Sequence, residues 1–114
     1  MSGCLFCRIV SGEMPASLVY QDERVLAFRD INPQAPNHVL VIPRKHIATL
    51  NDLSPEDDEL VGELVRRGAA IARELGVSDA GYRTVFNCNA DAGQTVFHIH
   101  LHVLGGRRLG WPPG

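Results

Sequence analysis

The chain has 114 residues, of which 45% are hydrophobic and 21% charged, with a formal net charge of −2. This length suits one domain, which we expect to span residues 1–114, and it is too short for two separate cores. The near-neutral charge lacks the basic character of proteins that bind nucleic acid, and no apolar run is long enough for a transmembrane helix. We therefore expect a cytoplasmic protein with neither nucleic-acid nor membrane partners.

In the first half of the chain, short apolar runs alternate with turn residues. They predict a helical turn at Phe6–Val10 and strands at Ser17–Tyr20, Arg24–Phe28 and His38–Ile42. The first two strands are separated by three polar residues, which suits a hairpin. The third is a continuous β-branched run that stops at Pro43, as expected of a central strand.

The second half predicts one long helix followed by two strands. Ser54-Pro55-Glu56-Asp57 supplies a cap, a proline at the first helical position and acids in the first turn, and Gly76 suits the helix end. One buried stripe is expected along this helix, made of Leu60, Val61, Leu64, Val65, Gly68, Ala72 and Leu75. Strands are expected at Tyr82–Phe86 and Phe97–Leu104, with a polar loop at Asn87–Gln94 between them. The predicted fold class is α+β: about five antiparallel strands, one long helix and a short N-terminal helix.

Three of the five histidines lie at every second residue of the last predicted strand, at His98, His100 and His102. A strand sends alternate side chains to opposite faces, so the three imidazoles share one face, while Phe97, Ile99, Leu101 and Val103 pack on the other. A half-buried strand with a polar face would more often carry Thr, Lys, Glu or Ser. We therefore expect the chemistry of the protein here.

Cys4 and Cys7 have the two-residue spacing that allows both thiolates to reach one tetrahedral ion. Their position ahead of any strand favours zinc over a thioredoxin-like redox pair. From spacing alone, the two cysteines could instead be small apolar residues of a short helix. A strand His-x-His pair can also chelate zinc, so His100 and His102 could instead hold a catalytic metal.

The segment Asn87–Thr95 leads directly into the histidine strand and is rich in small and polar residues. Backbone amides of such a loop can hold phosphate oxygens without a basic cluster. An ordinary strand connection would have the same composition. Its position next to the histidines favours the phosphate-binding interpretation.

His98-Ile99-His100-Leu101-His102-Val103-Leu104 resembles the histidine triad motif, His-φ-His-φ-His-φ-φ, of nucleotide hydrolases and transferases. Further segments resemble the Hint branch of this histidine triad (HIT) family, at residues 27–36, 38–43, 92–97 and 104–114. The resemblance covers nearly the whole chain. It implies a HIT-like fold and a homodimer that binds a purine nucleotide.

The resemblance implies that His100 is the nucleophile that attacks the α-phosphorus, and that His102 holds the phosphate and the leaving group. The product would be a nucleotidyl-imidazole, which water hydrolyses to a nucleoside monophosphate. The implied enzyme is a hydrolase of purine nucleoside 5′-phosphoramidates or related nucleotidyl conjugates. The alternatives are a dinucleoside polyphosphate hydrolase, which the C-terminal Trp-Pro-Pro-Gly disfavours, and a nucleotide-binding regulatory adaptor.

The same resemblance implies the residues that contact the nucleotide. Asp30 would accept the ribose hydroxyls, and His38 would orient the triad from behind. Asn87, Gly93, Gln94 and Thr95 would contact phosphate and ribose, and the apolar base pocket would comprise Leu5, Phe6, Ile9, Met14, Phe28 and Ile31. In zinc-bearing bacterial relatives, the cysteine pair is joined by histidines that match His46 and His98. The resemblance thus implies a structural zinc ion on Cys4, Cys7, His46 and His98, with no metal required for catalysis.

Overall fold

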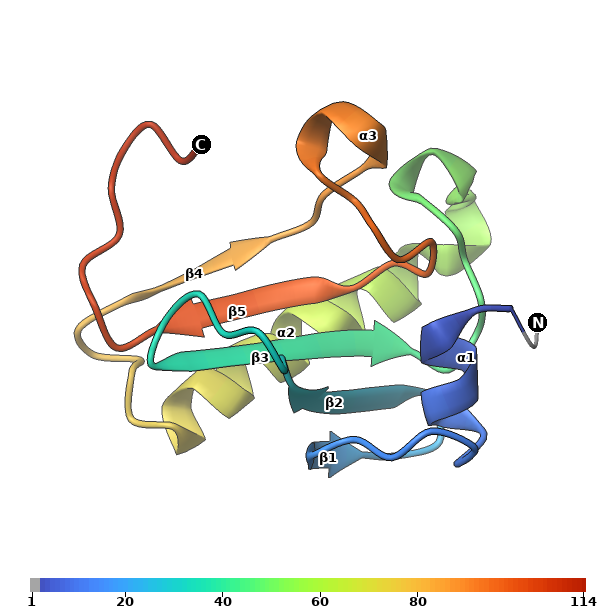
Figure 1. The fold of residues 1–114 in the computed structure, drawn as a ribbon, viewed down its shortest axis with the longest axis horizontal. Helices are drawn as coiled ribbons and strands as arrows, with labels where there is room; N and C mark the ends of the chain where they lie inside the picture. Colours follow the sequence, from blue (N-terminus) through green and yellow to red (C-terminus); the bar gives the residue numbers. More distant parts are fainter. Residues whose placement is uncertain (1–2) are drawn as a thin grey trace.

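The protein is built on a five-stranded antiparallel sheet, with the strand order β1-β2-β3-β5-β4 (Figure 1). The computed structural model describes residues 3–114. The strands are β1 (Leu18–Gln21), β2 (Val25–Arg29), β3 (Asn37–Pro43), β4 (Tyr82–Val85) and β5 (Leu101–Gly105). The helices are α1 (Leu5–Val10), α2 (Asp58–Glu74) and α3 (Asn89–Ala92), with 3₁₀ turns at Leu50–Asp52 and Pro55–Asp57. The predicted α+β class, the N-terminal helix, the β1–β2 hairpin and the central position of β3 are confirmed.

The two faces of the sheet are covered by different helices. On β2 and β3, alternate residues such as Ala27 and Val41 pack in the core that α2 covers. Their neighbours Phe28 and Leu40 point to the other face, where α1 packs through Phe6. The long helix lies behind the sheet and α1 crosses one end of the opposite face (Figure 1). The histidine-bearing face is therefore the one that α1 covers in part.

Helix α2 packs closely against β5, the strand that carries His102. A Cβ atom at Gly68 would lie 3.1 Å from the side chain of Leu101 and 3.3 Å from that of Val103, which is tighter than an ordinary van der Waals contact. The buried residues are Leu60, Leu64, Gly68, Ile71 and Ala72. The expectation that Val65 is buried is wrong, because this side chain is 47% exposed on the flank of the stripe. Gly76 has a positive φ of 78° and ends the helix as predicted.

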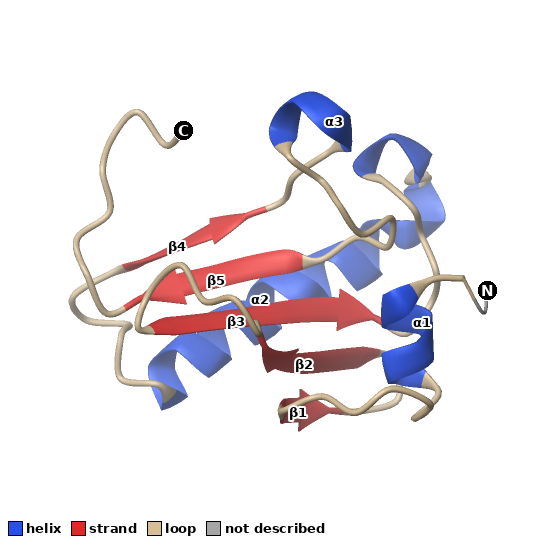
Figure 2. Cartoon of the chain, in the orientation of Figure 1, coloured by secondary structure: helices blue, strands red, loops and turns tan. Residues whose placement is uncertain are grey.

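The last strand is shorter than the predicted Phe97–Leu104. β5 begins at Leu101, and the segment before it is not a strand (Figure 2). Leu101 pairs with Val41, so extending the ladder by two residues would place Ile99 opposite Pro43, which has no amide hydrogen to donate. The Ile99 amide instead donates to the carbonyl of Ile47, at 2.8 Å. His98 and His100 therefore precede the strand, and only His102 lies on it.

The expected side-chain alternation persists through this irregular segment. Ile99, Leu101 and Val103 belong to the core that α2 covers, which leaves the three histidines on the other side. The expectation that Phe97 packs with them is wrong, because its side chain is 46% exposed.

The predicted polar loop at Asn87–Gln94 contains one helical turn, α3, which ends at Gly93 with a φ of 87°. Short polar residues favour such a turn, and the left-handed glycine then redirects the chain toward the histidines. Within residues 3–114, no helix has the length and apolar character needed to cross a membrane.

Candidate active site

His100 is held by a backbone carbonyl on one side of its ring. Its Nδ1 lies 2.8 Å from the carbonyl oxygen of His98. A carbonyl can only accept, so Nδ1 carries the hydrogen and the lone pair of the neutral ring is on Nε2. No side chain or backbone group of the described residues pairs with Nε2, and the ring lines a cavity. Burial lowers the pKa of His100, which keeps the ring neutral and its lone pair available at neutral pH.

Two successive hydrogen bonds determine which ring nitrogen of His102 carries the hydrogen. The amide of Gln34 donates to Nδ1 of His38 at 3.0 Å, so neutral His38 carries its hydrogen on Nε2. This nitrogen lies 2.9 Å from Nδ1 of His102, which therefore accepts. His102 is left with its hydrogen on Nε2, as a donor.

The rings of His38 and His102 are both neutral at neutral pH. Burial is the main cause that lowers the pKa of His38, partly opposed by the nearby carboxylate of Asp30. Burial, followed by the neighbouring His100 and His38, lowers the pKa of His102 to about 4. The site thus combines one imidazole that offers a lone pair with one that offers a hydrogen.

Asp30 lies beside these two rings at the end of β2. Its Oδ2 is 3.4 Å from Nε2 of His38, and its Oδ1 accepts the amide of Asn32 at 2.8 Å. The carboxylate also lines the cavity, so it retains acceptor capacity toward a ligand.

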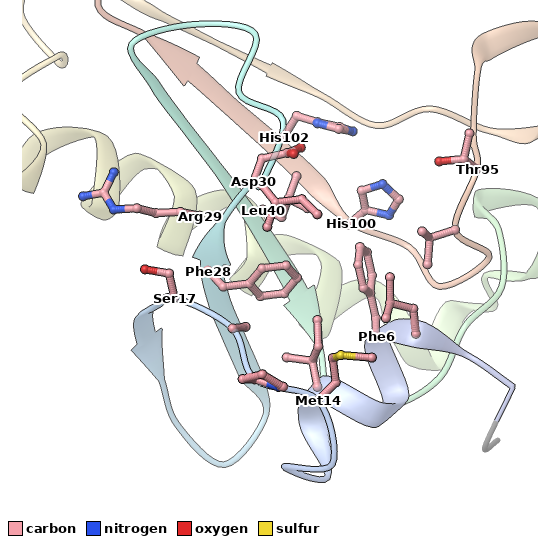
Figure 3. A pocket seen from close by; sticks show the side chains of 16 residues that line it. Phe6, Met14, Ser17, Phe28, Arg29, Asp30, Leu40, Thr95, His100 and His102 are labelled. Carbon is pink, nitrogen blue, oxygen red and sulfur yellow. The ribbon is translucent and has the colours of Figure 1, made fainter.

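The cavity has a volume of about 370 Å³ and lies between α1, β2 and the triad segment (Figure 3). All the residues expected to form the base pocket line it: Leu5, Phe6, Ile9, Met14, Phe28 and Ile31. Thr95 also lines it, on the side of His100 away from Asp30 (Figure 3). The cavity is therefore apolar at one end, with histidines, a carboxylate and a hydroxyl at the other.

Three residues expected to contact the nucleotide, Asn87, Gly93 and Gln94, are not among those that line the cavity. Gln94 is buried and its amide is fully engaged by backbone. The Asn89 amide donates to Oε1 at 2.8 Å, while Nε2 donates to the carbonyls of Ala48 and Val96 at 2.9 and 3.1 Å. Gln94 thus fixes the loop that presents Thr95.

Sequence reasoning missed Arg29, Leu40, Val96 and the Pro15–Ser17 segment, which also line the cavity. Arg29 comes directly before Asp30, at the end of β2. Leu40 could have been found from its position two residues after His38, on the same face of the predicted strand. Val96 and the Pro15–Ser17 segment lie in irregular segments, where no periodic pattern shows which way a side chain points.

The two cysteines, His46 and His98 converge in a second site next to the first. Nδ1 of His98 lies 3.5 Å from Sγ of Cys4, 3.6 Å from Sγ of Cys7 and 3.3 Å from Nδ1 of His46. Sγ of Cys7 lies 3.2 Å from Nδ1 of His46. A tetrahedral zinc ion would separate its ligand atoms by about 3.5 Å for nitrogen and sulfur and about 3.3 Å for two nitrogens. The four residues therefore fit such an ion.

The hydrogen bonding of His98 agrees with that fit. Its Nε2 lies 2.7 Å from the carbonyl oxygen of Pro43, so the hydrogen is on Nε2 and the lone pair of Nδ1 faces the cluster. A ligating histidine ordinarily donates its other N–H to such an acceptor.

Asp30, His38 and His102 form the other group of described residues close enough to share a metal. The Gln34 amide argues against that use. It occupies Nδ1 of His38, so coordination by Nε2 would require loss of the ring's remaining hydrogen. The alternative of a catalytic metal on His100 and His102 also lacks support, because neither convergent group within residues 3–114 contains His100.

The model of the HIT domain matches residues 11–109. The chain belongs to the HIT domain family. It is 48% identical over 106 residues to the purine nucleoside phosphoramidase of Escherichia coli strain K12, which covers 93% of this chain and 89% of that one. It is 50% identical over 110 residues to a HIT-like protein of Synechocystis, which covers 96% of each.

Solved structures of HIT proteins have the same fold. A HIT family hydrolase from Legionella pneumophila superimposes with a TM-score of 0.97 at 55% identity, covering 98% of this chain and 100% of the other. A histidine triad protein from Clostridium difficile superimposes with a TM-score of 0.93 at 43% identity, covering 96% of both. The predicted family and HIT-like fold are confirmed.

Proposed function

We propose that this protein is a hydrolase that cleaves purine nucleoside 5′-phosphoramidates, or related nucleotidyl conjugates, to nucleoside monophosphates. The observation that carries the proposal is the hydrogen bond from Nδ1 of His100 to the His98 carbonyl, which leaves Nε2 of a neutral ring free at the cavity. A neutral imidazole can attack phosphorus without a separate base. The similarity to the E. coli phosphoramidase supports this substrate class.

In the first step, Nε2 of His100 bonds to the α-phosphorus and the phosphorus–nitrogen bond breaks, with its electron pair going to the departing nitrogen. That nitrogen takes a proton from solvent and leaves as an amine. The hydrogen stays on Nδ1, which keeps donating it to the His98 carbonyl, and this hydrogen bond stabilises the positive charge of the nucleotidyl-imidazole.

His102 donates from Nε2 to the phosphoryl group and leaving group as charge develops there. Its Nδ1 is already occupied as an acceptor of the His38 hydrogen, so His102 acts as a neutral hydrogen-bond donor. His38 is the orienting residue. In the second step, water bonds to the same phosphorus, its proton goes to solvent, and His100 departs as neutral imidazole.

The nucleotide occupies the cavity with its purine among Phe6, Phe28 and the other apolar wall residues. Asp30 accepts the ribose hydroxyls, and Thr95 contacts the phosphate. Asn87 and Gly93 support this loop, with Gln94 acting through its backbone bonds.

The decisive experiment is rapid quenching of a reaction with labelled adenosine 5′-phosphoramidate, with analysis for adenylate bound to histidine. We expect label on the parent protein and none on His100→Ala. Turnover by the variant at the parent rate would overturn the nucleophile assignment. Rapid cleavage of diadenosine polyphosphates with slow phosphoramidate cleavage would favour the dinucleoside polyphosphate hydrolase. Nucleotide binding without turnover of either substrate would favour the adaptor.

We also propose that Cys4, Cys7, His46 and His98 bind a structural zinc ion. Four protein ligands leave no open position, so the ion when bound would supply stability and no reacting group. Metal analysis should give one zinc per chain in the parent and a large loss in Cys4→Ser. Far less than one ion in a carefully purified parent would contradict the proposal.

We further propose that each chain is one HIT domain and that two chains form a homodimer. β4 is an outer strand that pairs only with β5 in the described sheet, so its free edge can continue the sheet into a second copy. Light scattering coupled to size-exclusion chromatography should give twice the mass of one chain; a monomer mass at micromolar concentration would exclude the dimer.

A further inference from the structure

Helix α1 contributes to the cysteine–histidine cluster and to the nucleotide cavity at the same time. Cys4 caps its N-terminus and Cys7 lies one turn later, and both thiols face the cluster. Leu5, Phe6 and Ile9 of the same helix line the cavity. A helix of six residues is too short to be stable alone, so its position depends on what holds it from outside.

Few interactions fix α1 to the rest of the protein. Within residues 3–114, and apart from the contacts of the two cysteines with His46 and His98, the hydrogen bonds and ion pairs of residues 4–14 stay inside that segment. The remaining attachment is apolar packing against the sheet, chiefly through Phe6. The cluster is thus the polar anchor of this cavity wall.

Phe6 connects this wall to the reacting group. Its ring centroid lies 5.0 Å from that of His100 and 5.3 Å from that of Phe28, edge-on in both cases. The ring is 5% exposed, so it cannot move far without opening the cavity. A displacement of α1 would change both the purine pocket and the packing of His100.

His98 provides a second connection. Its ring belongs to the cluster, and its carbonyl oxygen accepts the Nδ1 hydrogen of His100 at 2.8 Å. The residue that completes the cluster therefore also orients the proposed nucleophile. One connection runs through a helix and the other through the backbone before β5, and they meet where Phe6 lies edge-on to His98, with 6.0 Å between the ring centroids.

From these shared residues we infer that the cluster of Cys4, Cys7, His46 and His98 positions the nucleotide cavity, so that metal binding and nucleotide binding strengthen each other. The inference rests on the proposed function, because it takes a purine nucleoside monophosphate as the cavity's ligand. Coupling between two sites is reciprocal: the factor by which zinc improves nucleotide affinity equals the factor by which nucleotide improves zinc affinity. A metal that only stabilised the fold would give a factor of one wherever the metal-free protein stays folded.

The test measures both sides of this cycle. Calorimetric titration with AMP compares zinc-loaded and chelator-treated protein, at a temperature where circular dichroism shows the sheet and α2 intact in both. We expect AMP to bind about tenfold more weakly without zinc, within the usual range for coupled sites. In the reverse direction, saturating AMP should reduce the apparent affinity of the chelator 4-(2-pyridylazo)resorcinol for the bound zinc by the same factor.

Cys88→Ser is the matched control, because this third cysteine is outside the cluster and should leave both measurements unchanged. Cys7→Ser should lose zinc and the AMP affinity together. Equal AMP affinity in folded protein with and without zinc would overturn the inference. Failure of the zinc-loaded protein to bind AMP at all would instead contradict the proposed function.

A second variant covers the case in which metal-free protein unfolds. Phe6→Ala keeps all four cluster residues but removes the contact between α1 and His100. In its zinc-loaded form, saturating AMP should protect zinc from the chelator much less than in the parent. Full protection in Phe6→Ala would overturn the connection through α1.

Discussion

The cysteine–histidine cluster and the triad cavity lie side by side and both are built on imidazole side chains, yet they arrange them for opposite purposes. In the cluster, the Nδ1 atoms of His46 and His98 converge with two thiols around one point. In the cavity, His100 presents a single lone pair, while His102 presents a hydrogen. One arrangement suits a cation and the other suits a phosphoryl group.

Backbone groups produce this difference. Nε2 of His98 donates its hydrogen bond to the Pro43 carbonyl, so the lone pair on Nδ1 faces the cluster. Nδ1 of His100 donates its hydrogen bond to the His98 carbonyl, so the lone pair of this ring is on Nε2 instead. The different roles of His98 and His100 are therefore set by which ring nitrogen donates to a carbonyl.

Replacing His100 by Asn should separate the two regions most clearly. The variant loses the nucleophile, so kcat for adenosine phosphoramidate should fall by about 10⁴-fold, as expected when covalent catalysis is removed. Zinc content should remain at the parent level, because the substituted side chain is outside the cluster. Steady-state assays of AMP release and metal analysis of the same preparation provide the check.

His46→Asn changes the cluster and leaves the cavity residues in place. It should reduce zinc content strongly while the protein still forms the adenylate adduct. A loss of turnover as deep as that of the His100 variant would show that the division between the two regions is wrong.

The sequence predicted most of the fold because hydrophobic periodicity and proline positions reflect local physics. Alternation on β2 and β3 and the spacing of Leu60, Leu64 and Gly68 specify which side chains are buried. The start of β5 could not be predicted, because it depends on Pro43 lying opposite Ile99, in a pairing of segments that are far apart along the chain. Local patterns carry no such register information.

The candidate site shows the same division. The triad, the cysteine pair and the apolar wall follow from spacing and family resemblance. The choice of tautomers does not, because it depends on the Gln34 amide and on the carbonyls of Pro43 and His98, which any residue type would supply. The role of Gln94 could not be predicted either, because its side chain bonds to the carbonyl of Ala48, which is distant along the chain.

Substitutions of His38 should test whether this residue determines which nitrogen of His102 carries the hydrogen. His38→Leu removes the donor to His102, so the His102 ring can adopt the other tautomer and kcat should fall by up to about 10²-fold, the size typical of lost orienting bonds. His38→Gln can place an amide N–H near the former Nε2 and should recover much of the loss. Equal kcat for the two variants, with AMP affinity retained, would exclude orientation as the role of His38.

The pH dependence of stability should report on His102. Its pKa of about 4 in the folded protein is below the usual value of 6.5, so between these values the unfolded chain binds more protons than the folded one. The free energy of unfolding should therefore decrease as pH falls from 7 toward 4, with a contribution from this residue on the order of 2 kcal/mol.

Urea unfolding of the parent and of His102→Asn at several pH values measures that contribution as the difference between two slopes. Metal release by acid affects both proteins and cancels in the comparison. Parallel stability curves for the two would show that His102 is not held neutral by its surroundings.

The smallest expected effect concerns the loop that joins the two regions. Gln94→Leu keeps the buried volume but leaves the Asn89 amide and the carbonyls of Ala48 and Val96 without their side-chain partner. Loss of these three hydrogen bonds should cost about 1–3 kcal/mol, measured by urea unfolding of zinc-loaded protein. AMP affinity should fall by about tenfold at most, because only the position of Thr95 in the loosened loop would be affected. Unchanged stability together with a deep loss of AMP binding would mean that the Gln94 amide turns to the ligand, and that its backbone bonds are not its function.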